Sequence, residues 1–282
     1  MPELLIELLS EEIPARMQAR AMEDLRRLIH ESLEKDGFDF SSIKTYSTPR
    51  RLVLVVDGLP SKTEDTKEEK RGPRFDAPDK AVDGFAKANR VSKYDLEIRS
   101  TEKGDFYFAV IEKKSFNIAE FVPVIVETAV INLVWPKSMR WGNSALTWVR
   151  PLHNILVVFD GKPIEGRIQL GTPYKIPGLN SGSLLKKDEK EIVFGPSTVG
   201  HRFLSPDSFT VTDFADYRDK LNAAHVILEP SRRRELIEAR AKALASEAGF
   251  ALRDDPGLLD EVTGLVEWPV VMIGDIGAEF MD

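Results

Sequence analysis

The sequence contains no cysteine, which excludes disulfide bonds and thiolate-based zinc sites within these 282 residues. No apolar run approaches the roughly 18 residues that a membrane-spanning helix needs, and the first residues show neither the basic start nor the apolar centre of a signal peptide. The four histidines show none of the close pairings typical of zinc motifs. We therefore expect a soluble, cytoplasmic chain with no membrane contact and no metal site.

The sequence also lacks the loops that hold nucleotides. It has no Walker-type phosphate loop and no glycine fingerprint of a dinucleotide-binding fold. No convergent set of an acid, a base and oxyanion donors can be found along the chain. The sequence thus predicts no catalytic residue and no cofactor in this chain, and it favours recognition over covalent chemistry.

Acidic residues outnumber basic ones, with 46 Asp and Glu against 39 Lys and Arg, which gives a net charge of -7. This balance argues against the indiscriminate binding of nucleic acid that bulk positive charge drives. Any such contact must come from local clusters. Four short motifs place Arg or Lys beside a Gly or Pro that restricts the backbone, as listed here: Thr48–Leu52, Lys70–Pro73, Met139–Gly142 and Gly200–Phe203. Two further clusters, Lys186–Lys187 and Arg232–Arg234, are interpreted as solvated surface.

A planar, permanently charged guanidinium on a restricted backbone suits phosphate or carboxylate ligands. The candidate binding residues are Arg50, Arg51, Lys70, Arg71, Arg140, Trp141, Arg150, His153, His201 and Arg202. Lys70 and Arg71 are the preferred pair for a direct RNA or partner contact, because residues 61–79 lose all apolar periodicity and predict an exposed loop.

The other candidates have a structural interpretation beside the functional one. Arg140 and Trp141 could offer a cation and a stacking face to a single-stranded RNA end, or Trp141 could anchor the core. His153 and His201 could contact RNA phosphate or a terminal ribose, or each ring could be fixed by a backbone carbonyl at a strand end.

Arg50 and Arg51 lie at a bend that leads into a strand, in which neighbouring side chains point to opposite faces. One of the two is therefore predicted to point inward and to pair with a buried acid among Glu7, Glu11 and Glu12. The acids Glu11 and Glu12, just before the first helix, are otherwise interpreted as a capping and dipole arrangement.

Strand and helix patterns alternate through the N-terminal part of the chain. The strand patterns lie at residues 4–8, 43–46, 51–56, 94–99 and 106–112, and the helix patterns at 13–33, 80–89 and 118–134. This order predicts an α+β protein with a ferredoxin-like βαββαβ region over residues 1–115. The C-terminal part predicts strands at 148–159, 163–170, 192–194, 209–211, 226–228 and 268–273 and helices at 214–223, 230–248 and 255–266.

Seven motifs in order resemble the N-terminal part of the β subunit of the bacterial, heterotetrameric glycyl-tRNA synthetase. They are Leu5–Pro14, Thr48–Leu52, Lys70–Pro73, Lys137–Gly142, Val149–His153, Gly200–Phe203 and Glu261–Val271. The resemblance implies a body- and tail-like α+β region over residues 1–139, similar to that of archaeal CCA-adding enzymes. A region similar to the B3/B4 module of phenylalanyl-tRNA synthetase would follow over 140–282 and continue beyond the last residue.

The same resemblance implies a function and partners. We expect a non-catalytic tRNA-recognition and assembly part of glycine-tRNA ligase, a class II aminoacyl-tRNA synthetase, with ATP and Mg²⁺ bound by the α subunit. The expected partners are that α subunit, tRNA-Gly and a second β subunit held through the α dimer. Two alternatives stay open at this point: an editing-type deacylase of mischarged tRNA, and a purely architectural module that docks subunits.

Overall fold

The structure is a computed structural model that describes residues 2–63, 65–113, 115–141, 146–170 and 191–277. Its contacts divide the chain into two compact units. The first unit combines residues 1–61 with 119–282, and the second holds residues 62–118. The central sheet of the first unit takes strands from both sides of the predicted division between residues 139 and 140. The mixture of helices and several sheets confirms the predicted α+β class.

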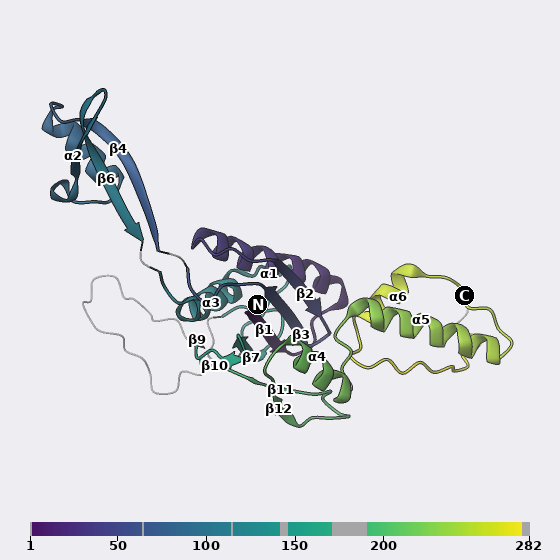
Figure 1. Cartoon of the computed structure of the whole chain (residues 1–282). Helices are drawn as coiled ribbons and strands as arrows, with labels where there is room; N and C mark the ends of the chain where they lie inside the picture. The colour runs from purple at the N-terminus through teal and green to yellow at the C-terminus, as the bar shows by residue number, and fades with distance from the viewer. Residues whose placement is uncertain (1, 64, 114, 142–145, 171–190, 278–282) are drawn as a thin grey trace. The chain divides into compact units, whose positions relative to one another are not determined.

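The first unit is built on a mixed sheet (Figure 1). Its strands are β1 (Glu3–Ser10), β2 (Ser42–Ser47), β3 (Arg51–Asp57), β7 (Leu152–Phe159), β8 (Lys162–Pro163), β9 (Arg167–Gln169) and β10 (Glu191–Gly195). The order is β2-β3-β1-β7-β10-β9, with β8 paired to β7. Only β10 runs parallel to its neighbour β7, and the other pairs are antiparallel.

Among the described residues, a two-stranded sheet and five α-helices complete this unit. The strands are β11 (Ser197–Val199) and β12 (Ser208–Thr210), and the helices are α1 (Ala15–Lys35), α3 (Val122–Asn132), α4 (Phe214–Ala223), α5 (Pro230–Glu247) and α6 (Pro256–Thr263). A short 3₁₀ turn, η2 (Ile118–Glu120), precedes α3. Among the described residues no helix is long and apolar enough to cross a membrane.

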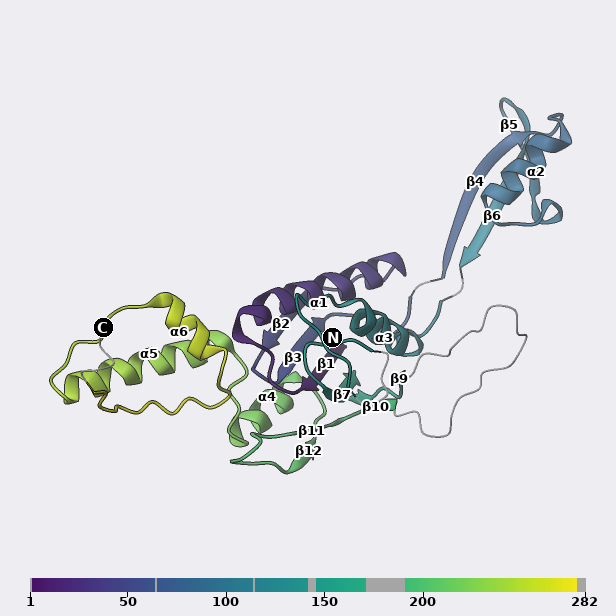
Figure 2. The same cartoon turned by 180° about the vertical axis from the view of Figure 1, so that it is seen from behind.

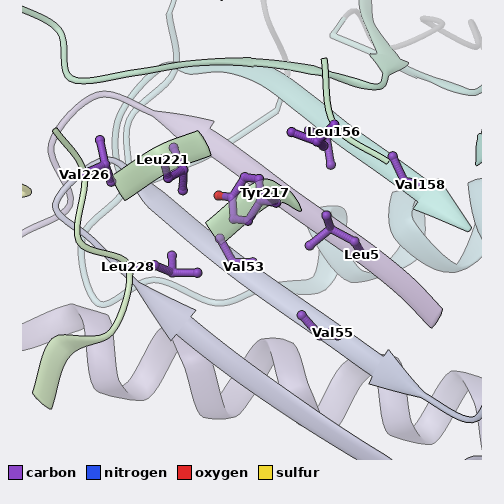
Figure 3. Close-up of a cluster of buried hydrophobic side chains, with 10 residues drawn as sticks. Leu5, Val53, Val55, Leu156, Val158, Tyr217, Leu221, Val226 and Leu228 are labelled. Atoms are coloured by element: carbon purple, nitrogen blue, oxygen red, sulfur yellow. The ribbon is translucent and has the colours of Figure 1, made fainter. Parts of the chain in front are cut away.

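Strands β1, β3 and β7 are buried on both faces, which explains their almost continuous apolar sequences. Helix α1 contacts β2 and β3 and buries a stripe of apolar residues at helical spacing (Figures 1 and 2). On the other face, Tyr217 and Leu221 of α4 pack against Leu5, Val53 and Leu156 (Figure 3). Val53 and Val55, two residues apart on β3, both belong to this cluster, as the alternation of side chains along a strand requires.

The second unit is a three-stranded antiparallel sheet with one helix. Its order is β4-β6-β5, formed by β4 (Thr66–Arg74), β6 (Gly104–Lys113) and β5 (Glu97–Thr101). Helix α2 (Asp79–Ala88) packs against β4, and a 3₁₀ turn, η1 (Lys93–Asp95), follows it. Because β5 and β6 pair here rather than with β1, the ferredoxin-like arrangement is not confirmed.

Two kinds of strand prediction were wrong. Residues 61–79, predicted as a loop, contain the edge strand β4. Its many charged side chains leave no apolar alternation that could have revealed a strand. The Gly72–Pro73 step falls at a bulge between Arg71 and Arg74. Conversely, residues 226–228 and 268–273 form no strand, since neither segment pairs in a ladder. The Lys186–Lys187 cluster, interpreted as solvated surface, lies in residues 171–190, outside the described residues.

Candidate functional site

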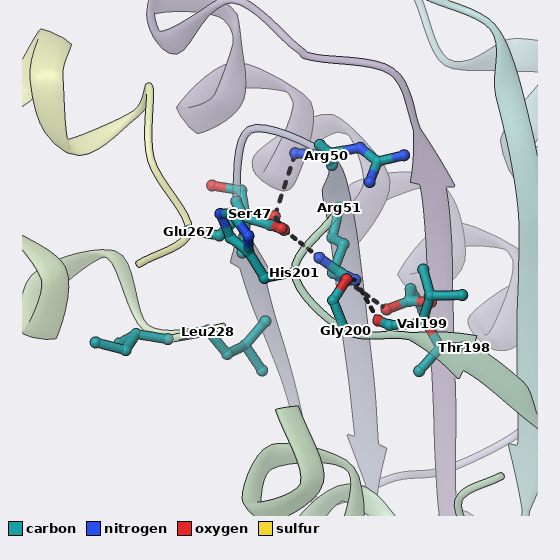
Figure 4. A network of polar contacts seen from close by, with 12 residues as sticks. Ser47, Arg50, Arg51, Thr198, Val199, Gly200, His201, Leu228 and Glu267 are labelled. Atoms are coloured by element: carbon teal, nitrogen blue, oxygen red, sulfur yellow. Dashed lines mark hydrogen bonds and ion pairs between the residues drawn. The ribbon is translucent and has the colours of Figure 1, made fainter. Parts of the chain in front are cut away.

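Arg51 lies at the centre of a buried polar network in the first unit (Figure 4). Its Nε donates to Glu7 Oε2 at 3.1 Å, one terminal nitrogen donates to Glu267, and the other donates to the carbonyls of Val199 and Gly200. Burial by itself lowers the pKa of the Arg51 guanidinium, but the charges of Glu267 and Glu7 outweigh it and raise the pKa. Each of the three side-chain nitrogens of Arg51 thus donates to a partner inside the first unit, and the residue is a charged structural centre.

The two acids of this network have further donors. Glu7 accepts hydrogen bonds from the hydroxyls of Thr198 and Tyr217, and burial raises the pKa of Tyr217 well above its usual value. Glu267 accepts a hydrogen bond of 2.7 Å from the hydroxyl of Thr48. We call Glu7, Thr48, Arg51, Thr198, Tyr217 and Glu267 the Arg51 network. It links β1, the turn before β3, β11, α4 and the segment that follows α6.

The predicted inward-pointing arginine is therefore Arg51, and its predicted partner Glu7 is confirmed. Arg50 is only half-buried, and its Nε donates to the Ser10 carbonyl at 3.3 Å. Burial lowers the pKa of Arg50, and the charge of Glu267 partly opposes this shift. Strand alternation separates the two arginines as the sequence predicts, whereas the binding role of both stays a prediction.

A second buried arginine was missed. Arg233 of α5 is fully buried and donates to the backbone carbonyls of Ser47, Ile227, Leu228 and Thr263 at 2.7–3.3 Å. The interpretation of Arg232–Arg234 as solvated surface is wrong for this residue. Burial lowers the pKa of Arg233 to about 10, so it stays charged at neutral pH. The apolar helical spacing of α5 marks Ile237, four residues later, as inward-facing, and that spacing was the available signal.

An ionic rim adjoins the Arg51 network. Glu11 Oε1 lies 2.8 Å from His153 Nε2, and Arg202 donates to Glu12 Oε1 at 2.7 Å while lying 3.5 Å from Glu11 Oε2. Burial acts to raise the pKa of Glu11, but the hydrogen bond from His153 and the nearby arginines lower it overall. The acids pair across the rim, and helix α1 has no side-chain cap, so the capping interpretation is wrong.

His201 is held by its own loop. Its Nδ1 accepts hydrogen bonds from the backbone N–H groups of Phe203 and Leu204, at 3.3 and 3.2 Å. Burial lowers the pKa of His201, and this favours the neutral ring that such acceptance requires. The sequence allowed each histidine ring to be fixed by a backbone carbonyl. The structure shows other partners: His201 accepts from backbone N–H groups, and His153 contacts the carboxylate of Glu11.

Three candidates lie away from these contacts. Arg150 is exposed and donates to the Val149 carbonyl at 2.8 Å. Arg140 is exposed and Trp141 is half-buried, in a segment that pairs with Trp148 through Met139. The last residue of that motif, Gly142, lies outside the described residues.

Lys70 and Arg71 lie on strand β4 of the second unit, not on a loop. Lys70 pairs in register with Ala109 and Arg71 with Phe108, so the two side chains point to opposite faces of the sheet. Lys70 lies 3.2 Å from Glu68. The guanidinium of Arg71 lies over the Phe106 ring, with Cζ 3.7 Å from the ring centroid.

Comparison with known proteins identifies the family to which the chain belongs. The family profile described as glycyl-tRNA synthetase beta subunit matches residues 4–282. The chain belongs to this family. It is 49% identical to a glycine-tRNA ligase beta subunit of Rhodospirillum centenum, 45% to one of Ruegeria sp. and 42% to one of Paracoccus denitrificans, each over 100% of this chain. The chain covers 40%, 39% and 38% of those relatives. It corresponds to their N-terminal part.

Within the described ranges, no three His, Asp or Glu side chains come together as possible metal ligands. What the geometry offers is a buried hydrogen-bonded network around Arg51, the ion pairs of Glu11 and Glu12, and the stacked Arg71 of the second unit.

Proposed function

We propose that this chain serves glycine-tRNA ligase in tRNA recognition and subunit assembly, while an α subunit binds ATP and Mg²⁺ and carries out glycine activation. The observation that carries this proposal is the family match over residues 4–282. Relatives named beta subunit imply an α partner in a hetero-oligomer. The assembly would be a heterotetramer in the cytoplasm, with tRNA-Gly as the nucleic-acid partner.

The recognition half of the proposal is supported by the charge of the second unit. Residues 62–118 are close to neutral, with 13 Lys and Arg against 12 Asp and Glu, whereas the whole chain has 39 against 46. A chain of net negative charge can bind RNA where cationic side chains gather on one part of its surface. The arginine-bearing face of the β4-β6-β5 sheet is the part of the second unit that combines charge with aromatic rings.

The assembly half is supported by exposed apolar side chains near the end of the chain. Between residues 250 and 276, large apolar side chains reach the solvent in close succession. They are Phe250, Leu252, Leu258, Leu265, Val270, Met272, Ile273 and Ile276. Soluble proteins seldom leave such a density of apolar surface uncovered, so it is expected at a subunit or domain contact.

Pyrophosphate exchange tests this division of labour. The 282-residue chain alone should give no glycine-dependent exchange of pyrophosphate into ATP, whereas the purified α subunit with a complete β subunit should. Exchange by the chain alone would contradict the proposal. The same preparation should not release an amino acid from mischarged tRNA-Gly. Release by the chain alone would instead support the editing-type deacylase.

Co-purification separates recognition from pure architecture. We expect the chain to retain the α subunit on a size-exclusion column and to shift tRNA-Gly in a gel. Retention of α without any shift of tRNA-Gly would support the architectural alternative. Failure to bind either partner would contradict the whole proposal.

A further inference from the structure

One face of the small sheet in the second unit combines three arginines with two phenylalanines. Phe106 and Phe108 alternate along β6 and so share a face, with Arg99 in register with Phe106 and Arg71 in register with Phe108. Arg74 is in register with Phe106 from the other side. We call these five residues the arginine–phenylalanine face.

The opposite face of the sheet is occupied by the helix. A Cβ atom added to Gly72 would lie 2.5 Å from the Phe85 ring of α2, so helix and strand are in close contact there. Lys70, two residues before Gly72, points to this same side. The arginine–phenylalanine face is therefore the side of this sheet that α2 leaves uncovered within the second unit.

The three arginines of the face differ in their partners. Arg99 donates to both oxygens of Glu69, at 2.8 and 3.0 Å, and to Glu97 at 2.6 Å. The register places both acids on this same face, so they neutralise the charge of Arg99 there. Arg74 donates to the Lys103 carbonyl at 2.6 Å. The side chain of Arg71 is exposed, and its guanidinium makes no hydrogen bond or ion pair with the described residues.

Stacking orients Arg71 without using its donors. The guanidinium carbon lies 3.7 Å above the centroid of Phe106, whose own side chain is 7% exposed. A cation over a ring is held by the negative face of the ring. The N–H groups at the guanidinium edge remain free to donate in the geometry that matches two oxygens of one phosphate.

We propose that Arg71, positioned by its stack on Phe106, binds a phosphodiester group of tRNA on the arginine–phenylalanine face. This inference rests on the proposed function and adds the residue and face that make the contact. Arg202 also lies over a phenylalanine ring, at 5.2 Å, but it donates to Glu12, whereas Arg71 stacks at 3.7 Å with its donors unused. The stacked side chain of Arg71 loses less conformational freedom on binding than a free lysine does. The outer plane of the guanidinium can also support an unpaired base.

Lys70 provides a matched control. It is the adjacent residue, carries the same charge and is also exposed, but it lies on the helix side of the sheet and 3.2 Å from Glu68. If bulk charge near β4 were all that mattered, neutralising Lys70 or Arg71 would weaken RNA binding equally. The geometry predicts that only the change at Arg71 has a large effect.

The experiment measures the affinity of the 282-residue chain for tRNA-Gly by fluorescence anisotropy at several KCl concentrations. Arg71→Met keeps an apolar cover on Phe106 but removes every donor. We expect it to weaken binding about tenfold and to reduce the slope of log K against log salt by about 1, as for the loss of one phosphate contact. Arg71→Lys should keep the slope and lose part of the affinity. Lys70→Met should change the affinity less than about twofold.

Equal effects of Arg71→Met and Lys70→Met would overturn the site while leaving the proposed function intact. A thermal midpoint of Arg71→Met equal to that of the parent chain would show that folding is not the cause. Competition by poly-glutamate as effective as competition by unlabelled tRNA would assign the face to an acidic polypeptide and also overturn the inference. No binding of tRNA-Gly by the parent chain, alone or with α, would contradict the proposed function as well.

Discussion

Replacing Arg51 with Met should strongly destabilise the first unit, whereas the same change at Arg50 should not. Arg51 is fully buried and faces Glu7 and Glu267, of which 0% and 4% of the side chain are exposed. Removing one partner of a buried ion pair leaves the other charge uncompensated, at a cost of about 3–5 kcal/mol. The hydroxyls of Thr198 and Tyr217 still serve Glu7 in the variant, so we expect the lower end, about 3 kcal/mol.

The assay is urea unfolding followed by circular dichroism. With a slope of about 3 kcal/mol per molar urea, a loss of about 3 kcal/mol lowers the midpoint by about 1 M. Arg50 is half-buried and makes one hydrogen bond of 3.3 Å through its side chain, so Arg50→Met should cost less than about 1 kcal/mol. The triple change Arg51→Met, Glu7→Gln and Glu267→Gln should recover part of the loss, because it removes the unpaired charges.

Equal and small midpoint shifts for Arg51→Met and Arg50→Met would refute this reasoning. They would mean that the interior around Glu7 is hydrated enough to solvate the carboxylates left behind. A large shift for Arg50→Met alone would show that the two arginines have exchanged roles.

Three further outcomes are expected. Arg233→Met should lower the free energy of unfolding in urea by about 2–4 kcal/mol, because it removes the donors of four buried carbonyls. Arg232→Met, on the exposed side of the same helix, should be nearly neutral. Similar losses for the two variants would contradict the burial of Arg233. Burial lowers the pKa of His201 in the folded state, so the unfolded state takes up a proton first as the pH falls. The stability that the neutral ring contributes is therefore fully present above a pH of about 6.5 and is lost below it. His201→Gln should flatten the decline in unfolding midpoint between pH 7 and 5, and an unchanged decline would exclude this residue as the cause. Gly264→Ala should lower the thermal midpoint by the equivalent of about 1–3 kcal/mol because a Cβ there would lie 2.4 Å from a side chain of α1, and Gly274→Ala, with open space around it, should not.

Periodicity in the sequence predicted the elements whose pattern the core itself imposes. Helix α4 begins and ends at the predicted residues, Phe214 and Ala223, and β3 covers the predicted residues 51–56 and one more, Asp57. Strand β4 was not predicted, because a small sheet stabilised by ion pairs across its strands needs no apolar alternation in its sequence. The ion pair between Glu69 and Arg99 is an example. Apolar content likewise misled at residues 268–273, where β-prone residues have no strand to pair with in the described chain.

The candidate site was predictable where local geometry decides it. Alternation at a strand entry required one of Arg50 and Arg51 to be inward-facing, and the acidic N-terminal segment supplied Glu7. The second acid, Glu267, lies 216 residues away from Arg51 in sequence, and no local pattern can reveal such a pairing. Lys70 and Arg71 point to opposite faces because they are neighbours on a strand. The sequence pattern placed them on a loop, so it could not predict this difference.

The most direct test of the account is to crosslink the chain to tRNA-Gly with ultraviolet light and to map the attached peptides by mass spectrometry. If recognition is carried by the arginine–phenylalanine face, crosslinked peptides will concentrate within residues 67–74 and 97–108 and will be lost in Arg71→Met. Crosslinks concentrated instead at His153 and Gly200–Phe203, with none in residues 62–118, would place recognition on the ionic rim and contradict the account.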